Sequence, residues 1–342
     1  MATQEKSRSY WGIVQPMPGP ILTAMAQQAE AQGLEGVFAP QVHGPPFLPL
    51  AVAAAATERI RLASGIAIAA ARSPFETAMA AIDMDRISNG RFTLGLGASV
   101  KSWTRGIYGA PEHKPLTHLR ETVAAVRHII AGAHEGLTPF EGQYYRADFE
   151  QLQPTAPPVR EEIPIWIAAL RGPAIRLGGE IADGLMGHPI WSIDWAVDEV
   201  QPDLKKGLER GGRRREDLHL NLWLFVAPSD SPEALEDAKR TVAFYAGVEQ
   251  YESFFEFHGF GKEARELQEY VKKGEVTAHA EAVPDEMART FTVMGDDDAV
   301  RTAIERAWTV ADSLCLVPPP YGTPLDRLVR YQADIARLFY GT

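Results

Sequence analysis

Residues 91–97 read RFTLGLG, an apolar run that ends in two glycines, Gly95 and Gly97. Glycine inside a strand packs no side chain and costs conformational entropy, so it usually marks a bend or the close approach of another group to the backbone. The stretch therefore predicts a buried strand whose carboxyl end lies against something else.

The same order, an apolar run followed by a helical pattern, continues along the whole chain. We predict eight strands, at residues 11–14, 36–40, 60–68, 91–97, 163–170, 184–189, 218–227 and 313–319. We predict eight helices after them, at residues 21–33, 47–57, 74–88, 116–131, 173–182, 191–210, 232–246 and 324–339. Near-continuous apolar strands that alternate with helices indicate a covered parallel sheet, and eight units favour a (β/α)8 TIM barrel over an open doubly wound sheet.

Two stretches interrupt the alternation and predict insertions into a single α/β domain of residues 1–342. Residues 134–160 are expected to form a loop or hairpin before the fifth strand, and residues 247–290 contain a charged helix. Long insertions in a compact fold are usually functional. Ser-Pro or Thr-Pro pairs at Ser73, Ser231 and Thr323 predict helix starts.

Composition narrows the class of partner. A formal net charge of −11 argues against nucleic acid, and the basic run RGGRRRED at 210–217 is interpreted as a solvated turn. The single cysteine, Cys315, excludes a disulfide framework. No apolar run has the length of a membrane span or a signal peptide, so we expect a cytoplasmic protein with no membrane partner.

Known catalytic motifs are missing. The segment GLGASV lacks the third glycine of a dinucleotide fingerprint, and no HExxH, P-loop or GxSxG motif occurs. The nine histidines show no metal-ligand spacing, so no metal site is predicted. A barrel without such groups is expected to take its reactivity from an organic cofactor.

The ordered set of motifs resembles one family. Residues 57–97, with YYR at 144–146, IPIWIAA at 163–169 and EIADGLMGHP at 180–189, are similar to the bacterial-luciferase-like flavin and deazaflavin oxidoreductases. The forms GIAIAAARSP and GLGASVK look most similar to members that depend on coenzyme F420. The resemblance implies F420 as the cofactor, with FMN as the alternative.

The resemblance also implies where the cofactor ring lies. Family members place the ring across the carboxyl ends of the strands, where Gly95 and Gly97 would leave room for it. They also have a non-proline cis peptide that matches Gly65-Ile66 here, in a bulge with Ala67 that backs the ring. The alternatives are a crowded packing point at the two glycines and an ordinary buried strand at Gly65.

Further cofactor contacts are expected at other strand ends. Gln41 aligns with a position where family members often carry a cofactor-contacting polar residue. A helix that starts at Gly172 and Pro173, strengthened by Arg171, offers free N–H groups and a helix dipole to the cofactor phosphate. Ala169, Leu170, Arg171 and Gly172 are therefore candidates, although Gly-Pro is also a common helix start. Arg72 and Lys101 are further candidates for the same anion.

Two histidines at predicted strand ends are the candidate catalytic groups. His43 follows the second strand and His188 ends the sixth, where polar residues of a barrel are usually functional. An imidazole near neutrality could exchange a proton with the substrate, although both side chains could instead be satisfied by the backbone. Some F420-dependent relatives have a Glu after the GxG segment, and this chain has Val100 and Lys101 there.

Aromatic residues provide either core packing or an apolar substrate pocket. The candidates are Trp103, Trp191, Phe254, Phe255, Phe257 and Phe260. Our first functional hypothesis is an F420-dependent oxidoreductase that moves a hydride between the deazaflavin C5 and an apolar organic substrate. The alternatives are an FMN-dependent monooxygenase supplied with reduced flavin by a separate reductase, and a non-catalytic flavin- or F420-binding protein. By analogy with the family we expect a homodimer.

Overall fold

The computed structural model describes residues 8–274 and 279–341. They divide into two compact units that interleave along the chain. The larger unit consists of Trp11–Met186 and Asp203–His219, and the smaller unit of residues 8–10, Gly187–Pro202 and the described residues from Leu220 onward. Each unit is described by itself below.

The larger unit is built on a parallel sheet with the strand order β1-β2-β3-β5-β8-β9, and β4 pairs with β5 beside β3. Its strands are β1 (Tyr10–Ile13), β2 (Gly36–Ala39), β3 (Arg61–Ser64), β4 (Ala67–Ile68), β5 (Phe92–Gly97), β8 (Ile165–Ala168) and β9 (Gly184–Met186). Every residue of β2, β5 and β9 is buried, as the near-continuous apolar runs predicted.

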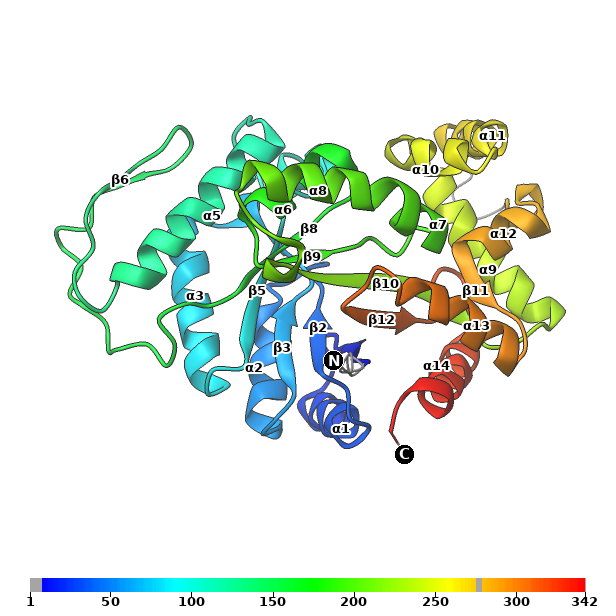
Figure 1. The fold of residues 1–342 in the computed structure, drawn as a ribbon, viewed down its shortest axis with the longest axis horizontal. Coiled ribbons are helices and arrows are strands. Elements are labelled where there is room, and N and C mark those ends of the chain that lie inside the picture. The colour runs from blue at the N-terminus through cyan, green and yellow to red at the C-terminus, as the bar shows by residue number, and fades with distance from the viewer. Residues whose placement is uncertain (1–7, 275–278, 342) are drawn as a thin grey trace, which may run out of the picture. The chain divides into compact units, whose positions relative to one another are not determined.

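Helices follow these strands in sequence. They are α1 (Gly19–Ala31), α2 (Phe47–Ala56), the 3-10 turn η1 (Ala69–Ala71), α3 (Pro74–Ile87), α4 (Lys101–Thr104), α5 (Pro115–Gly132), α6 (Gly172–Ile181), α8 (Gln201–Arg210) and the 3-10 turn η3 (Arg215–Asp217). Helices α2 and α3 pack beside β3 and β5 (Figure 1). The Ser73 hydroxyl accepts the Glu76 N–H at 3.1 Å, which confirms the predicted start of α3.

The predicted third strand is divided in two by a bulge. From Ala63 to Ala67 this strand advances four residues, while its partner β5 advances three, from Thr93 to Leu96. The Ser64 hydroxyl bridges the gap, because it donates to the Gly95 carbonyl at 2.8 Å and accepts the Gly95 N–H at 2.9 Å. A one-residue excess of this kind bends a strand and redirects the residues after it.

The first predicted insertion contains a hairpin, as expected. Strands β6 (Phe140–Glu141) and β7 (Arg146–Ala147) pair in antiparallel fashion before β8. The Glu121 carboxylate on α5 accepts the backbone N–H groups of Gln143, Tyr144 and Tyr145 at 2.6–2.7 Å. One partly buried carboxylate thus holds the hairpin turn against α5.

The smaller unit contains a parallel sheet in the order β11-β10-β12. Its strands are β10 (His219–Ala227), β11 (Thr292–Met294) and β12 (Ser313–Val317). Its helical segments are α7 (Ile193–Trp195), the π-helical turn η2 (Ala196–Val200), α9 (Pro232–Ala246), η4 (Glu249–Tyr251), α10 (Glu252–Phe257), α11 (Gly261–Lys272), η5 (Ala280–Ala282), α12 (Asp285–Phe291), α13 (Asp297–Ala307) and α14 (Leu325–Phe339). The described residues of the second insertion, 247–274 and 279–290, are therefore mostly helical.

Three features of the smaller unit differ from the sequence prediction. Strand β11 and helix α13 were not predicted, although Asp296 caps α13 by accepting the Ala299 N–H at 2.9 Å. The helix start predicted at Thr323 and Pro324 is present, but the Thr323 side chain does not cap the helix. Its hydroxyl donates to the Pro319 carbonyl at 2.7 Å, and α14 begins after Pro324 without a side-chain cap.

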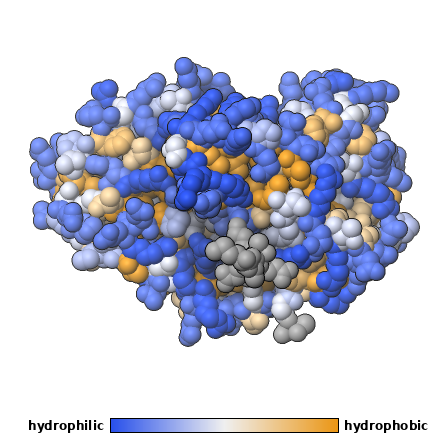
Figure 2. Space-filling model, in the orientation of Figure 1, coloured by the Kyte–Doolittle hydropathy of each residue, from blue (hydrophilic) through white to orange (hydrophobic). Residues whose placement is uncertain are grey.

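Apolar residues fill both units and polar ones dominate the surface. In the larger unit Trp11 stacks on Phe38, with ring centroids 4.5 Å apart, and both are fully buried. Hydrophilic residues cover most of the face in Figure 2, with hydrophobic residues between them. Within the described residues, no helix combines the length and the apolar character of a membrane span.

Candidate functional site

Gln41, which follows β2, is the centre of a hydrogen-bonded cluster at the carboxyl edge of the larger unit's sheet. Its side chain is buried. Its Oε1 accepts the Ile68 N–H at 2.9 Å and Nη2 of Arg72 at 3.0 Å, and its Nε2 donates to the Tyr108 hydroxyl at 2.9 Å. Gln41 therefore links the ends of β2 and β4 to the segment after β5.

Arg72 is the charged member of this cluster. Its guanidinium lies 5.3 Å from the Phe47 ring centroid, and burial lowers its pKa from the ordinary value, opposed by the nearby charge of Glu76. Its Nη1 is buried and has no hydrogen-bond partner among the described residues. A buried cationic donor without a partner is costly, so this atom favours an anionic or carbonyl group of a ligand as its partner.

The Gly65-Ile66 peptide bond is cis, as predicted. It lies in the bulge between β3 and β4, where the Gly65 N–H donates to the Ala39 carbonyl at 2.9 Å and the Ile66 carbonyl accepts the Gln41 N–H at 3.2 Å. Ala67 follows as the first, buried residue of β4. The bulge and the Gln41 cluster are thus one connected structure.

The expectation that Gly95 and Gly97 leave room for a ring is wrong in its physical reason. A Cβ at Gly95 would lie 1.8 Å from the Ser64 carbonyl oxygen, and one at Gly97 would lie 2.6 Å from Cδ1 of Ile66. Protein atoms therefore occupy the space of both missing side chains. The glycines allow the β3–β4 bulge to press against β5, which is the packing alternative.

The start of α6 contains an anion of the protein itself. A Cβ at Gly172 would lie 2.0 Å from Oδ2 of Asp203 on α8. Asp203 forms ion pairs with Arg176 at 2.6 Å and Lys206 at 3.6 Å, while Arg171 is exposed and caps no backbone group with its side chain. A phosphate at this helix start would have to share it with a carboxylate, which sequence reasoning missed.

The remaining residues proposed for the phosphate site have different surroundings. Ala169 is buried and its N–H donates to the Met186 carbonyl at 3.0 Å, and Leu170 lies between it and α6. Lys101 begins α4, is exposed, and forms an ion pair with Glu112 at 3.3 Å. Its ammonium group is thus already paired with a carboxylate of the protein.

His43 follows β2 two residues after Gln41 and is exposed. Its imidazole has no hydrogen-bond partner within the described residues, so it is not a histidine satisfied by the backbone. A free imidazole at a strand end is available to a ligand.

His188 follows β9 and belongs to the smaller unit. Its Nδ1 accepts the Ile190 N–H at 3.2 Å, so the neutral ring carries its proton on Nε2, which lies 3.4 Å from the Tyr251 hydroxyl. Burial lowers the pKa of His188 to about 3. This histidine is therefore neutral at physiological pH and offers a fixed N–H donor rather than a labile proton.

The six candidate aromatic residues have different surroundings. Phe254 and Phe255 are fully buried and belong to the core, whereas Phe257 is exposed on one side. Trp191 and Phe260 line a cavity of about 470 Å³ in the smaller unit. Trp103, on α4 of the larger unit, lines neither this cavity nor the pocket described next.

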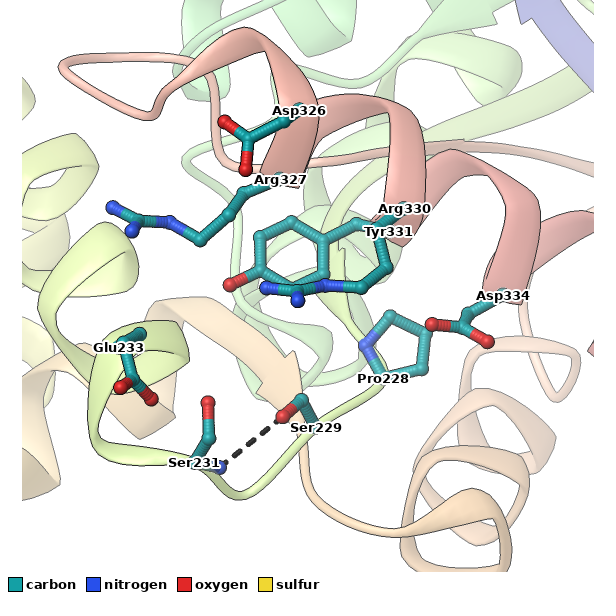
Figure 3. Close-up of a pocket in the computed structure, with 9 residues that line it drawn as sticks. All are labelled: Pro228, Ser229, Ser231, Glu233, Asp326, Arg327, Arg330, Tyr331 and Asp334. Atoms are coloured by element: carbon teal, nitrogen blue, oxygen red, sulfur yellow. Dashed lines mark hydrogen bonds between the residues drawn. The ribbon is translucent and has the colours of Figure 1, made fainter.

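A second pocket of the smaller unit, of about 480 Å³, lies between the start of α9 and the side of α14 (Figure 3). Arg327 and Tyr331 extend from α14 in Figure 3, and both are bound to another residue of the protein. Arg327 makes two bonds to the buried Asp237 carboxylate, at 2.7 and 2.8 Å, and the Tyr331 hydroxyl donates to it at 3.0 Å. These groups serve to hold α14 on α9.

Sequence reasoning missed Tyr108 and Asp203 as parts of the site. Tyr108 lies after β5 and binds Gln41 at the carboxyl edge of the sheet. Because polar residues that follow barrel strands are usually functional, its position in the sequence could have identified it. Asp203 is far from Gly172 in sequence, and no spacing signals their contact. Among the described residues, no three His, Cys, Asp or Glu side chains are grouped to hold a metal ion.

Comparison with known proteins identifies relatives over most of the chain. The family model for luciferase-like monooxygenases matches residues 14–311. An uncharacterized Mycobacterium tuberculosis protein is 32% identical over 300 residues, 84% of this chain and 88% of the relative. A putative coenzyme F420-dependent oxidoreductase of the same species is 31% identical over 327 residues, 90% of this chain and 92% of the relative.

Solved structures with the same fold include enzymes of both cofactor types. The coenzyme F420 dependent tetrahydromethanopterin reductase from Methanopyrus kandleri matches with a TM-score of 0.79 at 21% identity, over 96% of this chain and 97% of the other. A type II Baeyer–Villiger monooxygenase of Pseudomonas putida in complex with FMN matches with a TM-score of 0.66 at 17% identity, over 96% and 97%.

These likenesses confirm the predicted (β/α)8 barrel of the bacterial-luciferase type. The chain belongs to the luciferase-like monooxygenase family of oxidoreductases.

Proposed function

We propose that this protein is a coenzyme F420-dependent oxidoreductase that acts on an apolar organic substrate. The observation that carries the proposal is the buried Nη1 of Arg72, which has no partner among the described residues and lies in the Gln41 cluster beside the cis bulge. The relative named a putative coenzyme F420-dependent oxidoreductase, whose match covers 90% of the chain, supports this choice of cofactor. When bound, F420 supplies hydride transfer at its C5 atom.

The larger unit supplies the groups that would hold the cofactor. Arg72 would donate to an anionic or carbonyl group through Nη1 while Gln41 holds Nη2 in place. The bulge of Gly65, Ile66 and Ala67 would support the ring, and Gly97 contributes by admitting the Ile66 side chain. Arg171, with Gly172 and Lys101, would provide cationic and N–H contacts to phosphate.

The proton that accompanies hydride movement needs a group of this chain. The two positions after the GLGAS segment carry no carboxylic acid, because they are Val100 and Lys101. His43 is exposed after β2 and is our first choice for the proton. His188, neutral and fixed by the Ile190 N–H, is assigned a hydrogen-bond donor's role toward substrate or Tyr251 instead.

The second candidate is an FMN-dependent monooxygenase that receives reduced flavin from a separate reductase. The fold likeness to an FMN complex supports it. A non-catalytic binding protein is the third reading, favoured by the missing acid at position 100. The proposal also includes a cytoplasmic homodimer that binds neither nucleic acid nor membranes, in keeping with the net charge of −11 and the single cysteine.

Variants of Arg72 and His43 test the proposal by separating binding from turnover. Arg72→Gln should weaken F420 binding by about tenfold or more, because a hydrogen bond to a charged group is worth about 1.5–3 kcal/mol. His43→Ala should bind F420 normally and lose turnover by about 100-fold with a suitable substrate.

Arg61→Gln is the matched control, since Arg61 pairs with Glu35 at 3.0 Å and has no unpartnered buried nitrogen in the described structure. Fluorescence titration and the bleaching of F420 absorbance measure the two properties. Equal binding by the Arg72 and Arg61 variants would contradict the assignment.

A further inference from the structure

A cavity of about 470 Å³ in the smaller unit contains groups that the proposed function does not use. Its walls come from the loop after β9, from β10 and β11, and from α12 and α13. The volume is that of a small-molecule site. Trp191, Phe225 and Phe291 provide aromatic walls, and Ser192 and His258 are polar members of the lining.

Ser192 and His258 are in direct contact although 66 positions separate them. Their Oγ and Nε2 atoms are 2.7 Å apart. Ser192 Oγ also accepts the Trp195 N–H at 2.9 Å, which fixes the hydroxyl oxygen at the start of α7. With the imidazole proton on Nδ1, the serine donates its hydrogen to Nε2. This is the arrangement of a nucleophile and its general base.

The charge state of His258 suits a base. Burial lowers its pKa from the ordinary value, and the charge of Asp194 opposes this shift. The ring is therefore neutral at physiological pH and free to take a proton. Asp194 forms an ion pair with Arg306, another lining residue, and its charge would stabilise the imidazolium that proton transfer produces.

Aromatic rings lie beside the pair, and the cavity lining also includes polar groups, among them the charged residues Asp194, Glu286, Arg289 and Arg306. The His258 ring centroid lies 5.3 Å from that of Phe291 and 4.8 Å from that of Phe257. Thr292, also in the lining, is buried, and its hydroxyl has no hydrogen-bond partner among the described residues. Aromatic rings beside the pair, together with the polar and charged groups of the lining, fit a small ester, whose aryl or short alkyl body contacts the rings and whose carbonyl group meets the polar groups.

We propose that Ser192 and His258 form a catalytic pair that transfers a small acyl group from an ester to water. Ser192 Oγ attacks the ester carbonyl carbon, His258 Nε2 takes the hydroxyl proton, and the bond from the acyl carbon to the alcohol oxygen breaks. The proton then passes to the departing alcohol. Water, deprotonated by the same nitrogen, attacks the acyl-serine, releases the acid and returns the proton to Ser192. No oxidant or reductant is consumed.

The competing explanation is structural. Ser192 caps α7, and its hydrogen bond to His258 links the end of α10 to the loop after β9. On this explanation the pair stabilises the fold and has no catalytic role. Ser231 offers a matched control, because it caps α9 by accepting the Ala234 N–H at 3.2 Å and contacts no histidine among the described residues.

The test is hydrolysis of p-nitrophenyl acetate by purified protein without added cofactor. Wild type should show saturable release of p-nitrophenol, with a rate that rises with pH through a midpoint below the ordinary imidazole pKa and then levels off. Ser192→Ala and His258→Gln should each lose at least about 100-fold, and Ser231→Ala should match wild type. Ser192→Asn keeps a side chain able to cap the helix and should also be inactive.

A covalent label makes the test independent of how the variants fold. When wild type is treated with an alkyl fluorophosphonate, Ser192 Oγ should attack phosphorus and give up its proton while the P–F bond of the reagent breaks and fluoride leaves. The protein then gains one phosphonyl group, which peptide mass spectrometry places on Ser192. No label on Ser192, or hydrolysis by Ser192→Asn within twofold of wild type, would overturn the proposal. Neither result bears on F420 binding, so the two proposals fail separately.

Discussion

Gly95 and Gly97 lie against different kinds of neighbouring atom. At Gly95 the neighbour is backbone, the Ser64 carbonyl, which cannot move away without disturbing β3. At Gly97 the neighbour is the far end of the Ile66 side chain, which has alternatives. The two glycines of RFTLGLG are therefore required by two different contacts. Both contacts come from the bulge between β3 and β4.

We predict unequal costs for the two alanine substitutions. Gly95→Ala should prevent folding or lower the free energy of unfolding by more than about 3 kcal/mol, because the clash is with backbone. Gly97→Ala should cost about 1–2 kcal/mol. Combining it with Ile66→Val, which removes Cδ1, should recover part of the loss. Urea denaturation measures all three proteins, and equal losses for the two single variants would contradict this packing.

Gly95 and Gly97 also show what residue patterns can predict. The sequence predicted that another group lies close to the carboxyl end of this strand, and the structure shows protein atoms in contact with both glycines. It did not predict that the neighbour is Ser64 and Ile66, because pattern reasoning does not reveal which atoms of a bulge face the adjacent strand. The cis peptide was predicted from a family resemblance rather than from residue chemistry.

At the scale of elements, the start of α6 brings opposite charges together. Asp203 on α8 lies against Gly172 and pairs with Arg176, while Arg171 stands exposed beside them. The helix dipole favours an anion here, and the protein has placed one of its own. Cofactor phosphate would then depend on the balance between these charges.

Charge substitutions at α6 should change F420 affinity in opposite directions. Arg171→Glu should weaken binding several-fold by reversing a charge, and Asp203→Asn should strengthen it several-fold by removing the competing carboxylate. Both effects should shrink at high salt, since exposed charges are screened. Titration at two salt concentrations checks this. Unchanged affinity in both variants at low salt would place the phosphate elsewhere.

Element prediction succeeded where apolar runs were long and failed where they were short. All eight predicted strands are present, and the third is broken by its bulge. Strand β11 was missed because TVM is only three residues long and stands inside an insertion. The π-helical turn at Ala196–Val200, in the predicted helix of residues 191–210, has no sequence signal that distinguishes it from α-helix.

For the whole molecule, buried histidine links stability to pH. Because burial lowers the folded-state pKa of His188 to about 3, the unfolded chain, with an ordinary imidazole, binds the proton more readily. Its contribution to stability is complete above the ordinary pKa of about 6.5 and is lost as the pH falls from there toward 3.

The free energy of unfolding should therefore fall by about 2 kcal/mol more in wild type than in His188→Gln between pH 7 and pH 5. Urea denaturation at both pH values measures the difference. Parallel pH profiles for the two proteins would show that His188 takes up a proton in the folded state without difficulty, and it would then be available for proton transfer.

The choice between F420 and FMN bears on the whole molecule, since both cofactors are found among structures of this fold. Purified protein should be titrated with each, following F420 fluorescence and FMN fluorescence in turn. If the buried Nη1 of Arg72 serves a deazaflavin, F420 binds at micromolar concentration or tighter and FMN binds much more weakly. Micromolar binding of FMN with none of F420 would contradict the proposed function directly.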